Sequence, residues 1–303
     1  MLRNLFLRRI DFVTLIGRSM FAATLIRRTS RVALLLSLVA LTVCLQAVAA
    51  AEEPVVEDVV FKAACDGSEQ RYVLMLPVAF QPELAHDVLI ALHGHGSDRW
   101  QFIRDPRGET RAARDVAAKH RMLFVSPDYR ARTSWMGPKA EADLVQIIEE
   151  LRKKYRVERV FVCGGSMGGS AALTFGALHP ELVAGIASMN GTANHLEYMG
   201  FQEVIAESFG GTKTAIPEEY KKRSAEYWPE RLKMPVAMTT GGQDTAVPPH
   251  SCQRLAGVLQ QLDRDVLLIH RENGGHSTGL EDGIAILEFM IQKAKPAAKP
   301  GAE

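Results

Sequence analysis

A serine flanked by glycines is the first candidate for chemistry. Ser166 lies at the centre of Gly164-Gly-Ser-Met-Gly168, directly after the apolar run 160–163 and before a helical pattern. Gly-x-Ser-x-Gly between a strand and a helix is typical of a sharp turn that lifts the serine hydroxyl out of a sheet, with small neighbours because the turn is tight. A phosphate-binding loop would need a Gly-Lys-Ser/Thr ending, which the motif does not have. The pattern therefore predicts that Ser166 is a nucleophile for acyl transfer.

A serine hydroxyl needs a base to remove its proton. His276 lies in a Gly-rich loop after the last apolar run, and Asp244 follows the run before it. Together they would form a Ser-His-Asp triad in which the carboxylate orients the imidazole. Asp128 and Glu272 are the alternatives for the acid. The order Ser, Asp, His along the chain differs from that of trypsin-like and subtilisin-like enzymes.

The negative oxygen of a tetrahedral intermediate needs two hydrogen-bond donors. We expect the backbone N–H of Met167, which follows the nucleophile, and that of His95 in the loop His93-Gly-His-Gly. His93 and His95 could also chelate a metal, but Ser97-Asp-Arg follows where the metallo-hydrolase pattern needs Asp-His. The sequence therefore predicts chemistry without metal or cofactor. Four side chains near the ends of strands or in the long connection described below are candidates for the substrate pocket: Trp100, Trp135, Asn190 and Tyr198.

The elements that must position these residues alternate along the chain. Short continuous apolar runs suit strands covered on both faces, and i, i+3, i+4, i+7 patterns suit helices packed against them. The alternation predicts one doubly wound α/β domain over residues 55–293 with a mostly parallel sheet. The expected strands are 72–76, 88–92, 122–125, 160–163, 182–187, 235–238 and 266–270, and the expected helices are 110–119, 140–154, 170–178, 250–262 and 280–293.

A charge-rich and aromatic stretch interrupts this alternation. Residues 193–234 contain two apparent helices between two core strands, and connections of this length are often lids or binding loops. We expect a short helical, lid-like insertion there. The Ala-, Lys- and Pro-rich tail 294–303 is expected to be disordered.

The amino-terminal segment has the composition of a targeting sequence. Residues 1–51 carry seven Arg and one Asp, which leaves a mildly acidic remainder and therefore no electrostatic footprint for nucleic acid. A basic region, about 14 apolar residues from Val32 and an Ala-rich exit indicate a secretory signal peptide. We expect export to the periplasm or medium, with an uncleaved membrane anchor as the alternative. Three cysteines lie after residue 51. Cys163 should be buried, and the sequence does not decide whether Cys65 and Cys252 form a disulfide.

The four loops in this order resemble the α/β-hydrolase superfamily over residues 55–293. Within it, Gly-Gly-Ser166-Met-Gly-Gly, the run Tyr220-Lys-Lys-Arg-Ser-Ala-Glu-Tyr227 and Asp244-x-x-Val-Pro resemble the catalytic domain of the prolyl oligopeptidase family and related small secreted feruloyl and acetyl-xylan esterases. The propeller of prolyl oligopeptidases does not fit between the leader and the first expected strand. The resemblance therefore implies an exported serine hydrolase of carboxylic esters, acting on small-molecule or polysaccharide-linked substrates. A serine peptidase or amidase, and a catalytically silent binding protein of this fold, are the alternatives.

Overall fold

The apolar runs form one twisted sheet in the part of the chain that the structure describes. The computed structural model describes residues 53–130 and 132–296, so the expected signal peptide at 1–51 and tail residues 297–303 lie outside the described residues. The strand order is β1-β2-β4-β3-β5-β6-β7-β8. β1–β2 and β2–β4 pair antiparallel and all other neighbours pair parallel, which confirms the mostly parallel sheet. The strands are β1 (Val56–Lys62), β2 (Glu69–Met75), β3 (His86–Leu92), β4 (Leu123–Pro127), β5 (Val157–Gly165), β6 (Gly185–Met189), β7 (Val236–Gly241) and β8 (Val266–Arg271).

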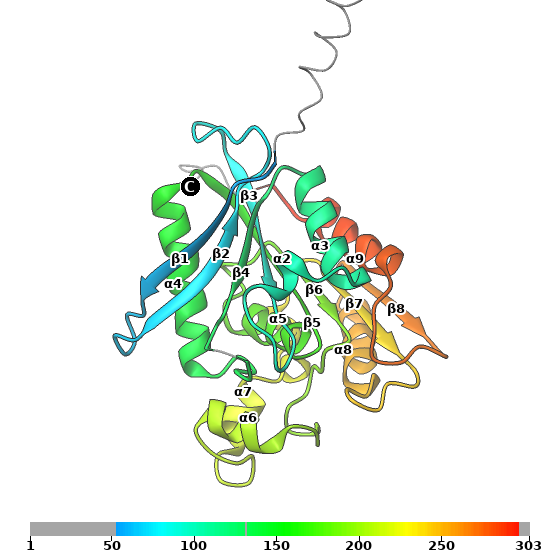
Figure 1. Cartoon of the computed structure of the whole chain (residues 1–303). Helices are drawn as coiled ribbons and strands as arrows, with labels where there is room; N and C mark the ends of the chain where they lie inside the picture. The colour runs from blue at the N-terminus through cyan, green and yellow to red at the C-terminus, as the bar shows by residue number, and fades with distance from the viewer. Residues whose placement is uncertain (1–52, 131, 297–303) are drawn as a thin grey trace, which may run out of the picture. The chain divides into compact units, whose positions relative to one another are not determined.

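Helices cover both faces of the sheet, as strands that are apolar on both sides require. In β5, Val160 and Val162 face the core layer formed with α4, α5 and α8, whereas Phe161 and Cys163 face the layer formed with α3 and α9. Figure 1 shows α3 and α9 side by side on their face of the sheet. The helices are α2 (Gln101–Arg104), α3 (Gly108–Lys119), α4 (Pro138–Lys154), α5 (Met167–Leu178), α6 (Gln202–Phe209), α7 (Pro217–Lys222), α8 (His250–Gln261) and α9 (Leu280–Lys293), with 3-10 turns η1 (Ala225–Tyr227) and η2 (Pro229–Arg231).

The sequence pattern did not predict β1 and α2. β1 lies at the edge of the sheet and mixes charged with apolar residues, because much of it stays exposed, with Phe61 as its buried residue. α2 has only four residues, too few to show a helical period. The long helices begin up to three residues before their apolar periodicity, since their first turns contain Gly or Pro.

The segment between β6 and β7 contains α6, α7, η1 and η2 and corresponds to the expected insertion. Figure 1 shows α6 and α7 beyond the carboxyl ends of the parallel strands. The buried Arg223 joins this segment to the body: its guanidinium donates to Glu141 at 2.8 Å, to Glu219 at 2.7 Å and to the Met136 carbonyl at 2.7 Å. Burial alone would raise the pKa of Glu141, but hydrogen bonds from His179 and Arg223 lower it to about 2. The ion pair of Glu141 therefore makes its full contribution to the free energy of unfolding at pH values above the ordinary carboxyl pKa. This contribution is lost as the pH falls through about 2.

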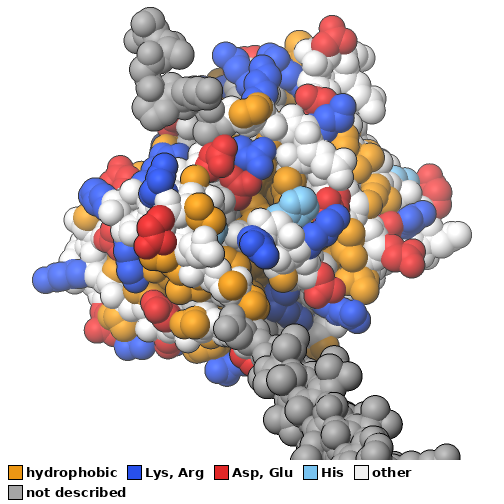
Figure 2. Space-filling model, turned by 90° about the horizontal axis from the view of Figure 1, so that it is seen from above, with side chains coloured by type: hydrophobic (Ala, Val, Ile, Leu, Met, Phe, Trp, Pro, Cys, Tyr) orange, Lys and Arg blue, Asp and Glu red, His pale blue; other side chains and the backbone are white. Residues whose placement is uncertain are grey.

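The remaining observations concern the cysteines, the surface and the apolar character of the helices. Cys65, Cys163 and Cys252 are free, and Cys163 is buried as expected. On the face seen in Figure 2, basic and acidic side chains lie interspersed among apolar ones. Within residues 53–130 and 132–296, none of the helices combines the length and apolar character needed to cross a bilayer.

Replacing Arg223 with Ala should lower the free energy of unfolding by about 3–5 kcal/mol, because Glu141 and Glu219 would lose their shared buried cation. Urea unfolding followed by circular dichroism measures this. Arg254→Ala is the matched control, since the Arg254 side chain is 46% exposed although it also pairs with two glutamates; its loss should be about 0–1 kcal/mol. Equal losses in the two variants would contradict the assigned role of Arg223.

Candidate active site

The turn between β5 and α5 has the strained geometry expected of a nucleophile elbow. Ser166 has φ 57° and ψ −118°, a conformation that a non-Gly residue adopts only when its surroundings enforce it. Its backbone N–H donates to the Met189 carbonyl at 2.8 Å. A β-carbon on Gly168 would lie 1.9 Å from the Leu92 carbonyl oxygen, and one on Gly164 would lie 2.4 Å from Gly168. The two glycines are therefore required by the close approach of α5 to β3, as the motif predicts.

The structure brings Ser166, His276 and Asp244 together at the carboxyl edge of the sheet. His276 Nε2 lies 2.8 Å from Ser166 Oγ, and His276 Nδ1 lies 2.6 Å from Asp244 Oδ2. With Nδ1–H donating to the carboxylate, Nε2 accepts the serine O–H. Neither alternative acid is placed at His276. Asp128 pairs with Arg99 at 3.0 Å, and Glu272 lies 3.6 Å from the ring of His270.

Asp244 is held in place by its own loop. Its side chain is buried, and Oδ1 accepts the backbone N–H groups of Ala246 at 3.0 Å and Val247 at 2.8 Å. Oδ2 is left for His276. Both carboxylate oxygens are thus engaged, which gives the carboxylate one orientation relative to the imidazole.

Asn190, one of the expected substrate-binding residues, makes hydrogen bonds to the loop that carries His276. It is buried at the end of β6, where Nδ2 donates to the Gly275 carbonyl at 3.1 Å. Its Oδ1 accepts the hydroxyls of Thr239 at 3.1 Å and Thr278 at 3.0 Å. Because Gly275 and Thr278 flank His276 in the chain, the Asn190 amide supports the loop that carries the imidazole.

The backbone N–H groups of Met167 and His95, the expected oxyanion donors, both lie in segments that adjoin Ser166. Met167 is the first residue of α5, so its N–H has no acceptor within the helix. Among the described residues, no hydrogen-bond acceptor is found for the N–H of His95. The His95 loop lies against the elbow, since a β-carbon on Gly94 would be 3.8 Å from Ser166 Cβ. Both segments that carry the expected donors therefore lie next to the serine.

The loop His93-Gly-His-Gly, called the oxyanion loop below, is held by side chains that the sequence analysis did not single out. Gln101 Oε1 accepts the Gly94 N–H at 2.7 Å, and the Tyr129 hydroxyl donates to the His93 carbonyl at 2.5 Å. The buried His93 ring lies between the carbonyls of Gly94 and Asp128, and burial lowers its pKa. In the described part of the chain, no three His, Cys, Asp or Glu side chains gather at a common metal position.

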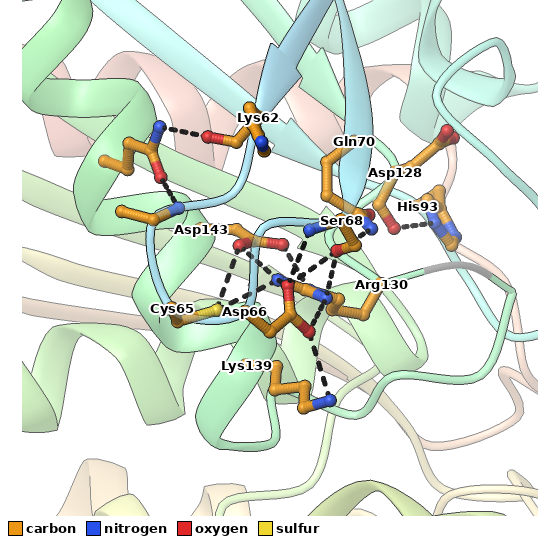
Figure 3. A network of polar contacts seen from close by, with 12 residues as sticks. Lys62, Cys65, Asp66, Ser68, Gln70, His93, Asp128, Arg130, Lys139 and Asp143 are labelled. Atoms are coloured by element: carbon orange, nitrogen blue, oxygen red, sulfur yellow. Dashed lines mark hydrogen bonds and ion pairs between the residues drawn. The ribbon is translucent and has the colours of Figure 1, made fainter.

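A polar network lies around Arg130, next to the loop that contains His95. Arg130 donates to Asp143 at 2.5 and 2.7 Å and to Asp66 at 2.8 Å, and Lys139 adds a second cation to Asp66 at 3.1 Å (Figure 3). The segment then supplies the Arg132 carbonyl, which accepts the Gly96 N–H at 2.8 Å. The Arg130 network and the hydrogen bond to Arg132 thus lie within two residues of each other in the chain.

Aromatic side chains line the site next to His95. The buried Trp135 donates its Nε1–H to His95 Nδ1 at 3.3 Å and packs on Tyr198 with ring centroids 5.5 Å apart. Phe201, which the sequence analysis overlooked, lies 4.2 Å from the His95 ring and is 42% exposed. Phe201 has a positive φ of 52° at the start of α6. A backbone angle cannot be read from the sequence, so no local pattern marked this residue.

The remaining expected pocket residues differ in their surroundings. Trp100 lies under the Arg104 guanidinium, which is 3.8 Å from its ring, and also contacts Arg99. Tyr198 is buried and donates its hydroxyl to the Ala246 carbonyl at 2.9 Å, in the loop of Asp244. Beside it, the insertion and that loop enclose a cavity of about 180 Å³, whose lining includes Tyr198, Met199, Thr245, Ala246 and His250.

Solved structures with this fold are serine hydrolases of several kinds. A thermostable esterase is 20% identical (TM-score 0.59), covering 79% of this chain and 63% of its own. A Bacteroides ovatus protein described as a dipeptidyl aminopeptidase IV is 20% identical (TM-score 0.64), with coverage of 79% and 36%. The fluorophosphonate-binding serine hydrolase F of Staphylococcus aureus is 14% identical (TM-score 0.63), with coverage of 79% and 99%. At these identities the likeness concerns the fold, and the chain spans about a third of the Bacteroides protein and less than two thirds of the esterase.

Sequence comparison gives the family. No curated protein matches the chain. The family model of the prolyl oligopeptidase family matches residues 129–293, more than half of the chain, including the elbow and the loops of Asp244 and His276. The chain therefore belongs to the prolyl oligopeptidase family of serine hydrolases, with the α/β-hydrolase fold.

Proposed function

We propose that this protein hydrolyses carboxylic esters through an acyl-enzyme on Ser166. The observation that carries the proposal is the hydrogen-bonded chain from Ser166 through His276 to Asp244, at 2.8 and 2.6 Å. The backbone N–H groups of Met167 and His95, for which the described residues offer no acceptor, lie in the neighbouring segments. A hydroxyl, a base and a charge-stabilising carboxylate in that arrangement are the parts that nucleophilic acyl transfer needs.

In the first half-reaction, Ser166 Oγ attacks the ester carbonyl while its proton passes to His276 Nε2. The imidazolium is stabilised by Asp244, and the developing oxyanion by the N–H groups of Met167 and His95. The carbon–oxygen bond to the alcohol then breaks, and the imidazolium gives its proton to the leaving oxygen.

In the second half-reaction, His276 takes a proton from water, whose oxygen attacks the acyl carbon. The tetrahedral intermediate collapses, the proton returns to Ser166 Oγ, and the carboxylic acid leaves. The chain's own residues supply every proton transfer, so the proposal needs no cofactor.

We propose that the substrate is a small-molecule or polysaccharide-linked ester. Phe201 and Met199, 42% and 74% exposed, are the apolar side chains that the insertion offers near His95 and the acid loop. We propose that they contact the apolar part of the ester, with Trp135 and Tyr198 packed behind them and Trp100 further along the loop. The insertion, residues 193–234, would then form a lid-like wall of the substrate pocket.

A serine peptidase or amidase is the second candidate. The family model and neighbours such as the acylaminoacyl peptidase of Pyrococcus horikoshii, 19% identical with TM-score 0.62 over 82% of this chain and 43% of its own, favour it. A catalytically silent binding protein is disfavoured by the hydrogen-bonded serine and histidine, because such a pair has no purpose in passive binding.

Replacing Ser166 with Ala should lower kcat on the order of 10⁴-fold or more while leaving the fold intact, because the nucleophile is lost. Hydrolysis of a p-nitrophenyl ester measures kcat, and a fluorophosphonate probe should label the wild-type protein at Ser166 and not the variant. Ser126→Ala is the control, since the buried Ser126 hydroxyl has no hydrogen-bond partner among the described residues. Activity retained in Ser166→Ala would show that another group is the nucleophile.

The ratio of ester to amide turnover separates the two candidate functions. We expect kcat/KM for p-nitrophenyl esters to exceed that for dipeptide anilides by at least about 10³-fold, since an amide is the harder bond to break. Esters of graded acyl length, feruloyl esters and acetylated sugars then define the acyl group. Comparable turnover of a dipeptide anilide would favour the peptidase.

We also propose that the protein is exported, from the basic and apolar composition of residues 1–51. Expressed as the full chain, it should be recovered from the periplasm or medium with its amino terminus near residue 50 or 52. Mass spectrometry of the amino-terminal peptide checks this, and a variant with Asp at Leu35 and Leu36 should stay in the cytoplasm. Recovery of the full-length chain in the membrane would instead support the uncleaved anchor.

A further inference from the structure

The outer edge of β8 is an apolar strand edge that has no partner in the described part of the chain. β8 is the last strand in the sheet order and pairs with β7 alone. Figure 1 shows it as the outermost strand, on the side of the sheet opposite β1. Residues 266–269 are all apolar, and each is partly exposed. An edge of this kind is a template for pairing with another strand, and soluble proteins usually cover it or place charges on it.

The other edge of the sheet does carry charges. β1 contains Glu57, Asp58 and Lys62 among its seven residues. Charged side chains on an edge strand oppose pairing with a further strand. The two edges therefore differ, and β8 rather than β1 has the composition of an edge that is covered.

The backbone of β8 presents a defined set of groups to the free edge. The carbonyls of Asp265 and Arg271 accept the N–H groups of Val236 and Gly242, so they face the β7 side. Because successive backbone groups of a strand alternate in direction, the N–H and C=O groups of residues 266, 268 and 270 face outward. An antiparallel partner strand must therefore set these outward-facing residues opposite one another.

The ends of β8 carry opposite charges in an order that suits a second copy of the same strand. Arg264 and Asp265 precede the strand, Arg271 is its last residue, and Glu272 follows it. When two copies pair antiparallel about a twofold axis at Leu268, Arg264 lies opposite the partner's Glu272. In the same register Asp265 lies opposite the partner's Arg271. Symmetry repeats both pairs, so four pairs of opposite charge flank the apolar centre.

The neighbouring registers lose this match. Moving the axis by one residue in either direction sets Arg264 opposite His270 or Gly274, and its ion pair is lost. The register about Leu268 also sets Val266 opposite His270 and Leu268 opposite its own copy. These are the outward-facing residues, so backbone hydrogen bonds and side-chain charges favour the same register.

The charged groups that this register pairs are available. Within residues 53–130 and 132–296, Arg264 has no ion-pair partner, and its buried Nε has no hydrogen-bond acceptor. The Glu272 side chain is 86% exposed. Arg271 binds Asp282 through Nε and Nη2, but its side chain is 65% exposed and its Nη1 is unused among the described residues. Asp265 is half-exposed.

Exposed apolar side chains lie on the helix beside the strand. Val258 and Leu262 are exposed, the first within α8 and the second directly after it. α8 packs on β8 and shares a core cluster with Val266 and Leu268. A twofold axis normal to the sheet keeps the helices on their own face, so it brings the α8 helices of two copies toward each other.

We propose that the protein forms a twofold-symmetric dimer in which β8 pairs antiparallel with β8 of a second copy. The pair is centred on Leu268 and is held in register by the two kinds of ion pair described above. The two sheets then continue into one another, and neither β8 edge stays open. This inference goes beyond the proposed function and does not depend on it. Because Glu272 begins the loop of His276, the dimer also contacts the start of that loop.

The test measures the molar mass by light scattering and the dimer Kd by sedimentation, on the purified protein expressed as the full chain. We expect a dimer at micromolar concentrations. Arg264→Glu and Glu272→Arg should each raise the Kd at least about tenfold, because each turns two attractive cross-strand pairs into two repulsive ones. An equimolar mixture of the two variants should form a heterodimer, because the reversed charges then match across the interface.

Lys62→Glu is the matched control, a charge reversal on the opposite edge of the sheet that should leave the Kd unchanged. Circular dichroism checks that each variant folds. If Arg264→Glu does not fold, Glu272→Arg alone decides, since its side chain is exposed. A wild-type protein that stays monomeric overturns the inference. So does an unchanged Kd in Glu272→Arg, or the failure of two folded variants to form the heterodimer.

Amide hydrogen exchange identifies what lies on the edge. The N–H groups of Val266, Leu268 and His270 should be protected in the dimer and should exchange faster on dilution to the monomer. Protection of these groups in a monomer would show that another segment of the same chain pairs with β8, which would overturn the proposed dimer.

Discussion

The close approach of α5 to the carboxyl end of β3 is the constraint on which the rest of the site depends. Gly168 lies so near the Leu92 carbonyl that no side chain fits between them. This contact brings the first turn of α5, which begins at Met167, beside the loop after β3, which contains His95. The strained backbone of Ser166 is held by this packing and by the hydrogen bond to Met189.

Buried polar groups, rather than the loops themselves, give the site its rigidity. Asn190 ties the loop of His276 to β6 and β7, and Gln101 and Tyr129 fix the oxyanion loop. Arg130 pairs with Asp143 and Asp66 next to that loop. A polar side chain that makes several hydrogen bonds is restricted in its arrangement, so each of these groups limits the movement of the segment that it contacts.

Glu109, in the first turn of α3, differs from these supporting groups because its charge is left without a full set of partners: within residues 53–130 and 132–296, its one ion-pair partner is Arg107 at 3.5 Å. A fold optimised for stability alone would pair or remove such a carboxylate. Its carboxylate oxygens lie against the backbone of Gly165, directly before Ser166. The same reasoning separates it from Arg223, whose three buried partners account for its presence in structural terms.

What could be read from the chain alone were the features that local spacing encodes. The glycines around Ser166, the order of Ser166, Asp244 and His276, and the apolar periods of the parallel strands are short-range patterns, and they predicted the fold and the residues that meet at its edge. The supporting residues could not be found in this way. The contacts of Asn190 with the loop of His276 were not predicted, and Gln101, Arg130, Phe201 and Glu109 were not singled out, because these contacts join segments far apart in the chain. Which polar group faces which loop is decided by the packing of the helices on the sheet, and no local pattern records it.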